Sequence, residues 1–218
     1  MPTIEGLRLR IQKYRRLKTA PCMKKKLTNP SFTIISNNCW GGMIYESYQL
    51  QKQSPTVGVF FMADDYIQFI SQLKEYLAID LEFIPPEKSK WKNAPQVGGD
   101  KRFGSYPIGR LKDVEVFFLH ARTPEEAREK WLRRIERVNW DRLLIKFNDQ
   151  NGCTSEHVER FLNLPYRNKV FFTCKKWGFD HKDIITICQP FHKEHMLVSY
   201  EPVGKSKYID ITKVLNSL

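Results

Sequence analysis

Cys39, His120 and Asp149 are the residues whose types and positions suit covalent or acid–base catalysis. A cysteine beside a helix N-terminus has a lowered pKa, and a histidine on a neighbouring strand could act as its base. A small packing cysteine is the commoner role. His120 and Asp149 could also form an acid–base pair in which the carboxylate orients the imidazole. The alternative is a histidine whose hydrogen bonds are satisfied at a strand end.

Residues 36–42 (Ser-Asn-Asn-Cys-Trp-Gly-Gly) connect an expected strand to an expected helix. Backbone N–H groups and the positive end of the helix dipole at such a turn suit a phosphate or a carboxylate. The run lacks G-x-G-x-x-G and the Lys-Ser/Thr of a P-loop, so a tight turn capped by its Asn side chains is an equal alternative. The predicted ligand-binding residues are Ser36, Asn37, Asn38, Trp40, Gly41, Gly42 and Asp64.

Metal binding has weaker support. Asp64 and Asp149 could hold a divalent cation against a nucleotide-sugar diphosphate, but no D-x-D motif is present. His192 and His195 form an H-x-x-H pattern without a third ligand at a suitable spacing, so a solvated turn is the better interpretation. We therefore predict no metal site, and the sequence identifies no cofactor.

Strand-like and helix-like segments alternate along the body of the chain. Strands are expected at residues 32–36, 57–62, 81–84, 114–119, 143–147 and 170–173, with edge strands at 184–187 and 196–200. Helices are expected up to Leu50, after an N-cap at Asp64 or Asp65, from an N-cap at Thr123 to Val138, at 155–162 and at 209–218. Residues 85–104 are expected to be irregular. This alternation of strands and helices predicts an α/β fold with three layers, α/β/α, and a largely parallel mixed sheet. Ligands bind outside the carboxyl ends of such strands, where the polar residues above would converge.

The N-terminal segment has a different character from the body. In residues 4–18 the apolar Ile4, Leu7, Ile11, Tyr14 and Leu17 recur at helical spacing, which predicts a helix packed by that face. A membrane-surface helix is the alternative. Residues 1–30 hold nine Lys or Arg and one acidic residue. We divide the chain into a basic helix and linker, 1–30, and a single α/β domain, 31–218.

Composition limits the protein class. The 218 residues are 41% hydrophobic with a mean hydropathy of -0.49 and no run of the roughly 18 apolar residues that a membrane span needs. Basic residues interrupt any secretory leader, so we expect a cytoplasmic protein, or one peripheral at the inner membrane. Five widely spaced cysteines are expected to be reduced. Most of the net charge of +12 lies in residues 1–30, which favours an anionic membrane surface over nucleic acid.

Several motifs occur together in order: 35–42 (Ile-Ser-Asn-Asn-Cys-Trp-Gly-Gly), 54–58 (Ser-Pro-Thr-Val-Gly), 106–109 (Tyr-Pro-Ile-Gly), Lys130-Trp131 and 137–141 (Arg-Val-Asn-Trp-Asp). From about Phe32 to about Thr173 the chain resembles a bacterial family with a domain of unknown function, whose members are often labelled exopolysaccharide or capsule biosynthesis proteins. The resemblance implies a three-layer α/β fold with a mixed sheet and a place in surface-polysaccharide production. It supplies no catalytic residues.

Two functional hypotheses follow. The first is an enzyme, such as a transferase, that acts on a phosphorylated or nucleotide-linked sugar. The alternative is a non-catalytic partner that its basic N-terminus tethers to a membrane polysaccharide-assembly complex at roughly 1 kcal/mol per basic residue.

Overall fold

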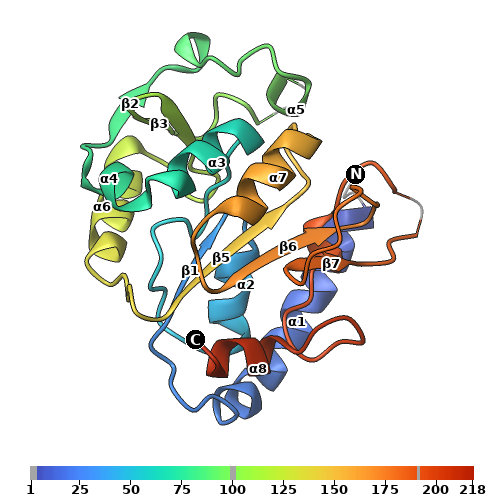
Figure 1. The fold of residues 1–218 in the computed structure, drawn as a ribbon. Coiled ribbons are helices and arrows are strands. Elements are labelled where there is room, and N and C mark those ends of the chain that lie inside the picture. The colour runs from blue at the N-terminus through green and yellow to red at the C-terminus, as the bar shows by residue number, and fades with distance from the viewer. Residues whose placement is uncertain (1–3, 99–101, 191) are drawn as a thin grey trace.

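A four-stranded parallel sheet forms the centre of the molecule in the computed structural model, which describes residues 4–98, 102–190 and 192–218 (Figure 1). Its order is β1-β5-β6-β7, and the strands are β1 (Thr33–Ser36), β5 (Leu143–Asn148), β6 (Lys169–Thr173) and β7 (Ile184–Thr186). Each neighbouring pair runs parallel, with Ile35 beside Ile145 and Phe147 beside Phe171. The predicted α/β class is confirmed, and β7 is an edge strand as expected.

Side chains alternate between the two faces along each strand, and most residues of these strands are apolar. Both faces of the sheet are therefore mainly apolar. Ile34, Leu144 and Phe172 point to the face covered by α2 (Trp40–Ser47) and α8 (Ile211–Asn216). Ile35, Ile145, Phe147 and Phe171 point to the opposite face. That face is covered by α3 (Ala63–Ser71), α4 (Leu73–Ala78), α6 (Pro124–Ile135) and α7 (Ser155–Asn163). The sheet therefore lies between two helical layers.

A second sheet is antiparallel, with the order β2-β3-β4. Its strands are β2 (Glu82–Ile84), β3 (Ile108–Leu111) and β4 (Val114–Phe117). The segment 114–119 is thus a strand, but it does not join the main sheet as expected. A hairpin through Lys112, whose φ is 58°, pairs it with β3, a strand that the sequence patterns did not predict.

Residues 57–62 are not the buried strand that we expected. Gly58 has a φ of 84°, which interrupts an extended backbone. Phe60 alone pairs with Phe117 of β4, and the Phe61 N–H donates to the Asn37 carbonyl at 3.1 Å. This segment links the two sheets instead of adding a strand to either.

Asp65 does not cap α3 as proposed. Met62 occupies the N-cap position without a side-chain bond, and the buried Asp65 carboxylate accepts from Lys90 Nζ and Trp91 Nε1, both at 2.5 Å. Burial raises the pKa of Asp65 to about 6. By contrast, the Thr123 cap of α6 is confirmed, since its hydroxyl accepts the Glu126 N–H.

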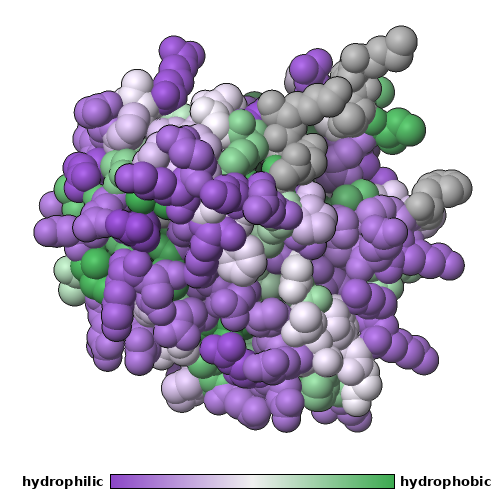
Figure 2. Space-filling view, turned by 90° about the horizontal axis from the view of Figure 1, so that it is seen from above, coloured by the Kyte–Doolittle hydropathy of each residue, from purple (hydrophilic) through white to green (hydrophobic). Residues whose placement is uncertain are grey.

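The remaining elements lie in the long connections. The irregular stretch contains the 3-10 turn η1 (Pro86–Lys88) and α5 (Pro95–Gly98), and the expected strand at 196–200 is the 3-10 turn η2 (Val198–Tyr200). All five cysteines are free. Within the described ranges, no helix combines the length and the apolar character that crossing a membrane requires. Hydrophilic side chains cover most of the face in Figure 2, where apolar patches are small and separate.

The N-terminal helix α1 (Ile4–Lys24) packs on α2 and η2, but by the opposite face to the one predicted. Gln12 Nε2 donates to the Ser199 carbonyl at 2.7 Å, and Arg16 and Ala20 are buried. The residues expected to pack are exposed instead: Ile4 90%, Leu7 54%, Ile11 47%, Tyr14 71% and Leu17 51%. Helical spacing places them on one face, but only the tertiary contacts decide which face turns inward.

Candidate functional site

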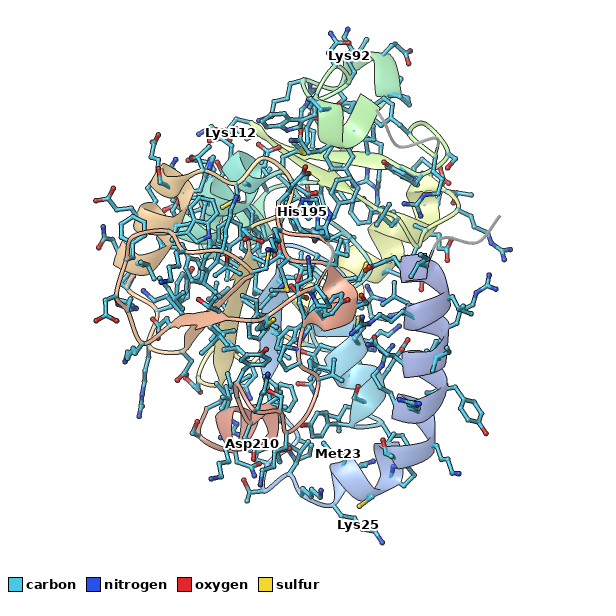
Figure 3. The ribbon with its side chains drawn as sticks, turned by 90° about the vertical axis from the view of Figure 1, so that its right-hand side faces the viewer. Met23, Lys25, Lys92, Lys112, His195 and Asp210 are labelled. Carbon is cyan, nitrogen blue, oxygen red and sulfur yellow. The ribbon has the colours of Figure 1, made fainter. Side chains whose placement is uncertain are left out.

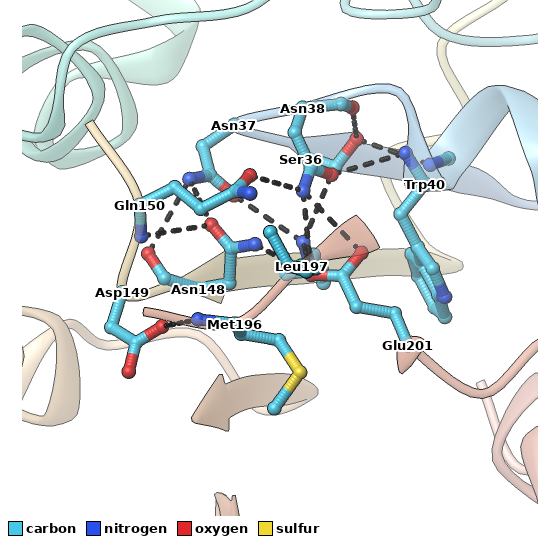
Figure 4. Close-up of polar contacts among 12 residues, drawn as sticks. Ser36, Asn37, Asn38, Trp40, Asn148, Asp149, Gln150, Met196, Leu197 and Glu201 are labelled. Carbon is cyan, nitrogen blue, oxygen red and sulfur yellow. Dashed lines mark hydrogen bonds and ion pairs between the residues drawn. The ribbon is translucent and has the colours of Figure 1, made fainter. Parts of the chain in front are cut away.

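Polar side chains converge at the carboxyl edge of the main sheet, where β1, β5 and β6 end (Figure 4). Asn37 Nδ2 donates to Asn148 Oδ1 at 2.7 Å, which joins the ends of β1 and β5. The Thr173 hydroxyl at the end of β6 donates to Asp149 at 2.5 Å. The parallel order of these strands is what brings these residues together.

A buried ion pair, Lys146 with Glu201, lies at the centre of this network. Lys146 Nζ lies 2.6 Å from Glu201 Oε1, and both side chains are 0% exposed. Lys146 also donates to Asn38 at 2.9 Å. Asn148 donates to Glu201 at 2.7 Å (Figure 4). Burial lowers the pKa of Lys146 and raises that of Glu201, while their mutual attraction opposes both shifts.

Neither member of this pair was among the residues that the sequence patterns predicted for the site. A lysine between the apolar Ile145 and Phe147 of β5 was the available signal, because a lysine is almost never fully buried unless it is paired. No local pattern marks Glu201, which reaches the network from the segment that follows η2.

The 36–42 turn is held by its own side chains. Asn38 Oδ1 accepts the Trp40 N–H at 3.0 Å, and Ser36 Oγ accepts the Gly41 N–H at 3.3 Å. Gly41 is needed there because a Cβ would lie 2.9 Å from Ser36 Oγ. Two N–H groups of the first turn of α2 are therefore already bonded, which matches the capped-turn alternative. The side chains of Ser36 and Asn38 make their hydrogen bonds within the turn and the buried network.

A cationic cavity of about 440 Å³ lies beside this turn, between α1, α2 and the second half of α6. Six basic side chains and one acidic side chain, Glu46, line it. The basic residues are Arg10, Lys13, Arg16, Lys52, Lys130 and Arg134. Cys39, Gly42 and His120 from the predicted site also lie in its wall. The volume is in the range of small-molecule sites.

Cys39 and His120 meet in the cavity wall, with Sγ 3.6 Å from Nε2. Gly58 allows this approach, since its φ is positive and a Cβ there would lie 3.3 Å from the His120 Cβ. Burial and the Glu201 charge raise the pKa of Cys39 to about 11, so the lowered pKa that we expected is wrong. Burial and then the Lys52 and Arg102 charges lower the pKa of His120. At neutral pH the pair is a thiol and a neutral imidazole.

The two aspartates of the predicted site lie apart from that pair. Asp149 is buried and accepts from Thr173 and from the Met196 N–H at 2.5 Å (Figure 4). Asp64 is exposed on α3, 3.6 Å from His157 Nε2. Among the residues that the structure describes, no carboxylate bonds to the His120 ring and no group of metal donors contains Asp64 or Asp149. Neither the His120–Asp149 pair nor the two-aspartate cation site is assembled.

Arg16 is the most unusual group in the cavity wall. It is 8% exposed, and its Nε and Nη1 have no hydrogen-bond partner within the described part of the chain. Its nearest counter-charge is Glu46, 3.9 Å from Nη2. Buried N–H donors are nearly always satisfied, and a bound anion would be one acceptor for these two groups.

A separate cluster joins His192, Glu194 and His195, whose ligand atoms lie within 4.8 Å of one another. Glu194 thus supplies the third donor that spacing alone did not suggest. Burial and the neighbouring His192 lower the pKa of His195, which favours its neutral, metal-competent form.

The lowered pKa of His120 predicts a pH dependence of stability. Its folded pKa lies below the unfolded value of 6.5, so the protein should lose stability as the pH falls through these values. We expect His120→Asn to remove part of this loss of stability. Urea unfolding of the unaltered protein and of His120→Asn between pH 5 and pH 8 measures the free energy of unfolding. Parallel pH profiles for the two proteins would show that His120 does not cause the loss.

Comparison with known proteins places the chain in a family. It is 31% identical over 177 residues to an uncharacterized protein of Haemophilus influenzae, covering 81% of this chain and 78% of that protein. The family profile described as "Domain of unknown function (DUF1919)" matches residues 10–218. This match is longer than the resemblance over 32–173 and includes most of α1. The chain therefore belongs to the DUF1919 family.

Proposed function

We propose that this protein binds a phosphorylated or nucleotide-linked sugar in the cationic cavity and acts on it as an enzyme of the transferase type. The observation that carries the proposal is Arg16, which lines the cavity with five further basic side chains and whose buried Nε and Nη1 have no hydrogen-bond partner within the described residues. Arginine and lysine donors of this kind bind phosphate oxygens through charge-assisted hydrogen bonds.

His120 is the proposed catalytic base. Its neutral imidazole accepts the proton of an acceptor hydroxyl while that oxygen forms a bond to the sugar carbon. The bond from this carbon to the phosphate oxygen breaks, and the basic side chains stabilise the charge on the departing phosphate. The raised pKa of Cys39 makes this thiol a poor nucleophile, so its proposed role is not covalent. Its Sγ instead orients the His120 imidazole through the 3.6 Å contact with Nε2.

The proposed biological setting is the production of bacterial surface polysaccharide. The support for this part is the sequence resemblance in the motifs at 35–42 and 137–141. Phosphorylated and nucleotide-linked sugars are the donors that such a process would consume, and they match the anionic chemistry of the cavity.

Lys52→Gln is expected to weaken nucleotide-sugar binding by about fivefold, since it removes one cation of the cavity wall. Isothermal titration calorimetry with UDP-sugars, sugar phosphates and uncharged sugars measures the affinities. The matched control is Lys88→Gln, which makes the same charge change at an exposed residue outside the cavity.

Binding of phosphate-bearing sugars that falls in the first variant and not in the second supports the proposal. Equal affinities for charged and uncharged sugars, or equal losses in the two variants, would refute the cavity as an anion site. Product formation that stops in His120→Asn while binding persists would separate catalysis from binding.

A further inference from the structure

The helix α1 exposes most of its large apolar side chains and makes polar contacts on its inner side, which differs from the usual arrangement of a surface helix. Its inner face uses polar contacts: Gln12 bonds to Ser199, and the Arg8 guanidinium lies 3.5 Å from the centre of the Tyr200 ring. Ile4, Leu7, Ile11 and Tyr14 follow one another at three- and four-residue steps along its outer side. We call these four residues the outer stripe. In Figure 3, α1 forms one edge of the molecule, and its outer side chains project away from the body.

We propose that the outer stripe of α1 docks on an anionic lipid bilayer, with the helix lying in the plane of the headgroup region. A basic helix with apolar residues along one side binds in this way by burying those residues at the acyl boundary. Tyr14 suits this depth because its ring is apolar and its hydroxyl remains hydrated.

The charges around the stripe select an anionic surface. Arg10, Arg15 and Lys18 are exposed on α1, and Lys25 and Lys26 follow its end. Long basic side chains can extend their charges to the headgroups while their methylenes lie along apolar surface. Residues 1–30 carry nine basic residues and only Glu5 as an acid, and Glu5 is bonded to Ser199. Each basic residue near an anionic leaflet contributes roughly 1 kcal/mol in general.

Docking would place the cationic cavity near the membrane, with α1 between the cavity and the lipid. Arg10 and Lys13 belong both to α1 and to the cavity wall. The bilayer proposal does not depend on what the cavity binds, because the outer stripe and the cavity lie on different sides of the helix.

Co-sedimentation with vesicles tests the proposal. The full-length protein should bind phosphatidylcholine vesicles that contain phosphatidylglycerol and bind pure phosphatidylcholine weakly, with a loss at high salt. Leu7→Ser together with Ile11→Ser should weaken this binding by at least about tenfold. Arg15→Gln and Lys18→Gln should each weaken it by about fivefold.

The matched control is Leu132→Ser, which removes an equally exposed leucine (49%) from α6 and should leave vesicle binding unchanged. Amide hydrogen exchange of the unaltered protein supplies a second measurement, with protection of residues 4–18 expected when anionic vesicles are added.

Three results would overturn the proposal: no binding to anionic vesicles, unchanged binding after the double replacement, or no gain of protection in residues 4–18. Size-exclusion chromatography with light scattering tests whether a second copy of this chain binds the outer stripe. A dimer that becomes a monomer in the double variant would show that the outer stripe binds a second copy of this chain instead of lipid.

Discussion

Lys146→Met should lower the free energy of unfolding by about 3–5 kcal/mol, because it leaves the Glu201 carboxylate buried without its counter-charge. Asn38 would lose a hydrogen bond at the same time. Glu201→Gln should have a smaller effect in the same direction, since an amide can still accept from Lys146. Urea unfolding of each variant, followed by circular dichroism, measures the difference.

The double variant Lys146→Met with Glu201→Leu distinguishes the cost of an unpaired charge from the value of the pair. Removing both charges should recover much of the stability lost in Lys146→Met, since well-packed apolar residues can replace a buried pair. Additive losses would contradict this account. A loss below about 1 kcal/mol in Lys146→Met would show that the charge is not buried as the geometry indicates.

The same pair connects the buried network to α1. Glu201 anchors the segment after η2 to β5, and Ser199 and Tyr200 in η2 contact Gln12 and Arg8 of the helix. Loss of the pair should therefore loosen α1 as well as the network. Hydrogen exchange of the α1 amides in Lys146→Met would detect this effect.

Arg16→Met should change stability and ligand binding in opposite directions. Removing a buried guanidinium whose Nε and Nη1 find no acceptor among the residues that the structure describes should raise the free energy of unfolding by about 1–3 kcal/mol. The same change should weaken phosphate-ligand binding by about a hundredfold, because it removes two charge-assisted hydrogen bonds. Thermal unfolding and calorimetric titration on the same preparations measure both effects.

Arg15→Met is the control for this prediction. It makes the same chemical change on the neighbouring residue, which is exposed and lies outside the cavity wall. We expect unchanged stability and unchanged affinity for soluble phosphorylated sugars. If Arg16→Met destabilises the protein and leaves affinity unchanged, Arg16 has a structural role with Glu46 and the anion site lies elsewhere.

The sequence by itself determined the α/β class and the strands of the main sheet. Leu143–Asn148 and Lys169–Thr173 are mainly apolar and short, as strands in the centre of a sheet covered on both faces are. Local chemistry also predicted the Thr123 cap, because the cap joins residues close in the chain. For the turn at 36–42 the sequence left a capped turn and an anion site as equal alternatives, and the structure shows the Asn38 side chain bonded to the Trp40 N–H.

Contacts between distant segments were decided only by the tertiary structure. The sequence contained no sign that Glu201 would meet Lys146, since 55 residues separate them. Burial reversed the expected pKa shift of Cys39, and the β3–β4 hairpin moved His120 from the main sheet to the cavity wall. For α1 the spacing predicted a helix and its apolar face, but the direction of that face depends on which partners the body offers. The body offers Ser199, Tyr200 and Glu46, which are polar, so the polar face turned inward.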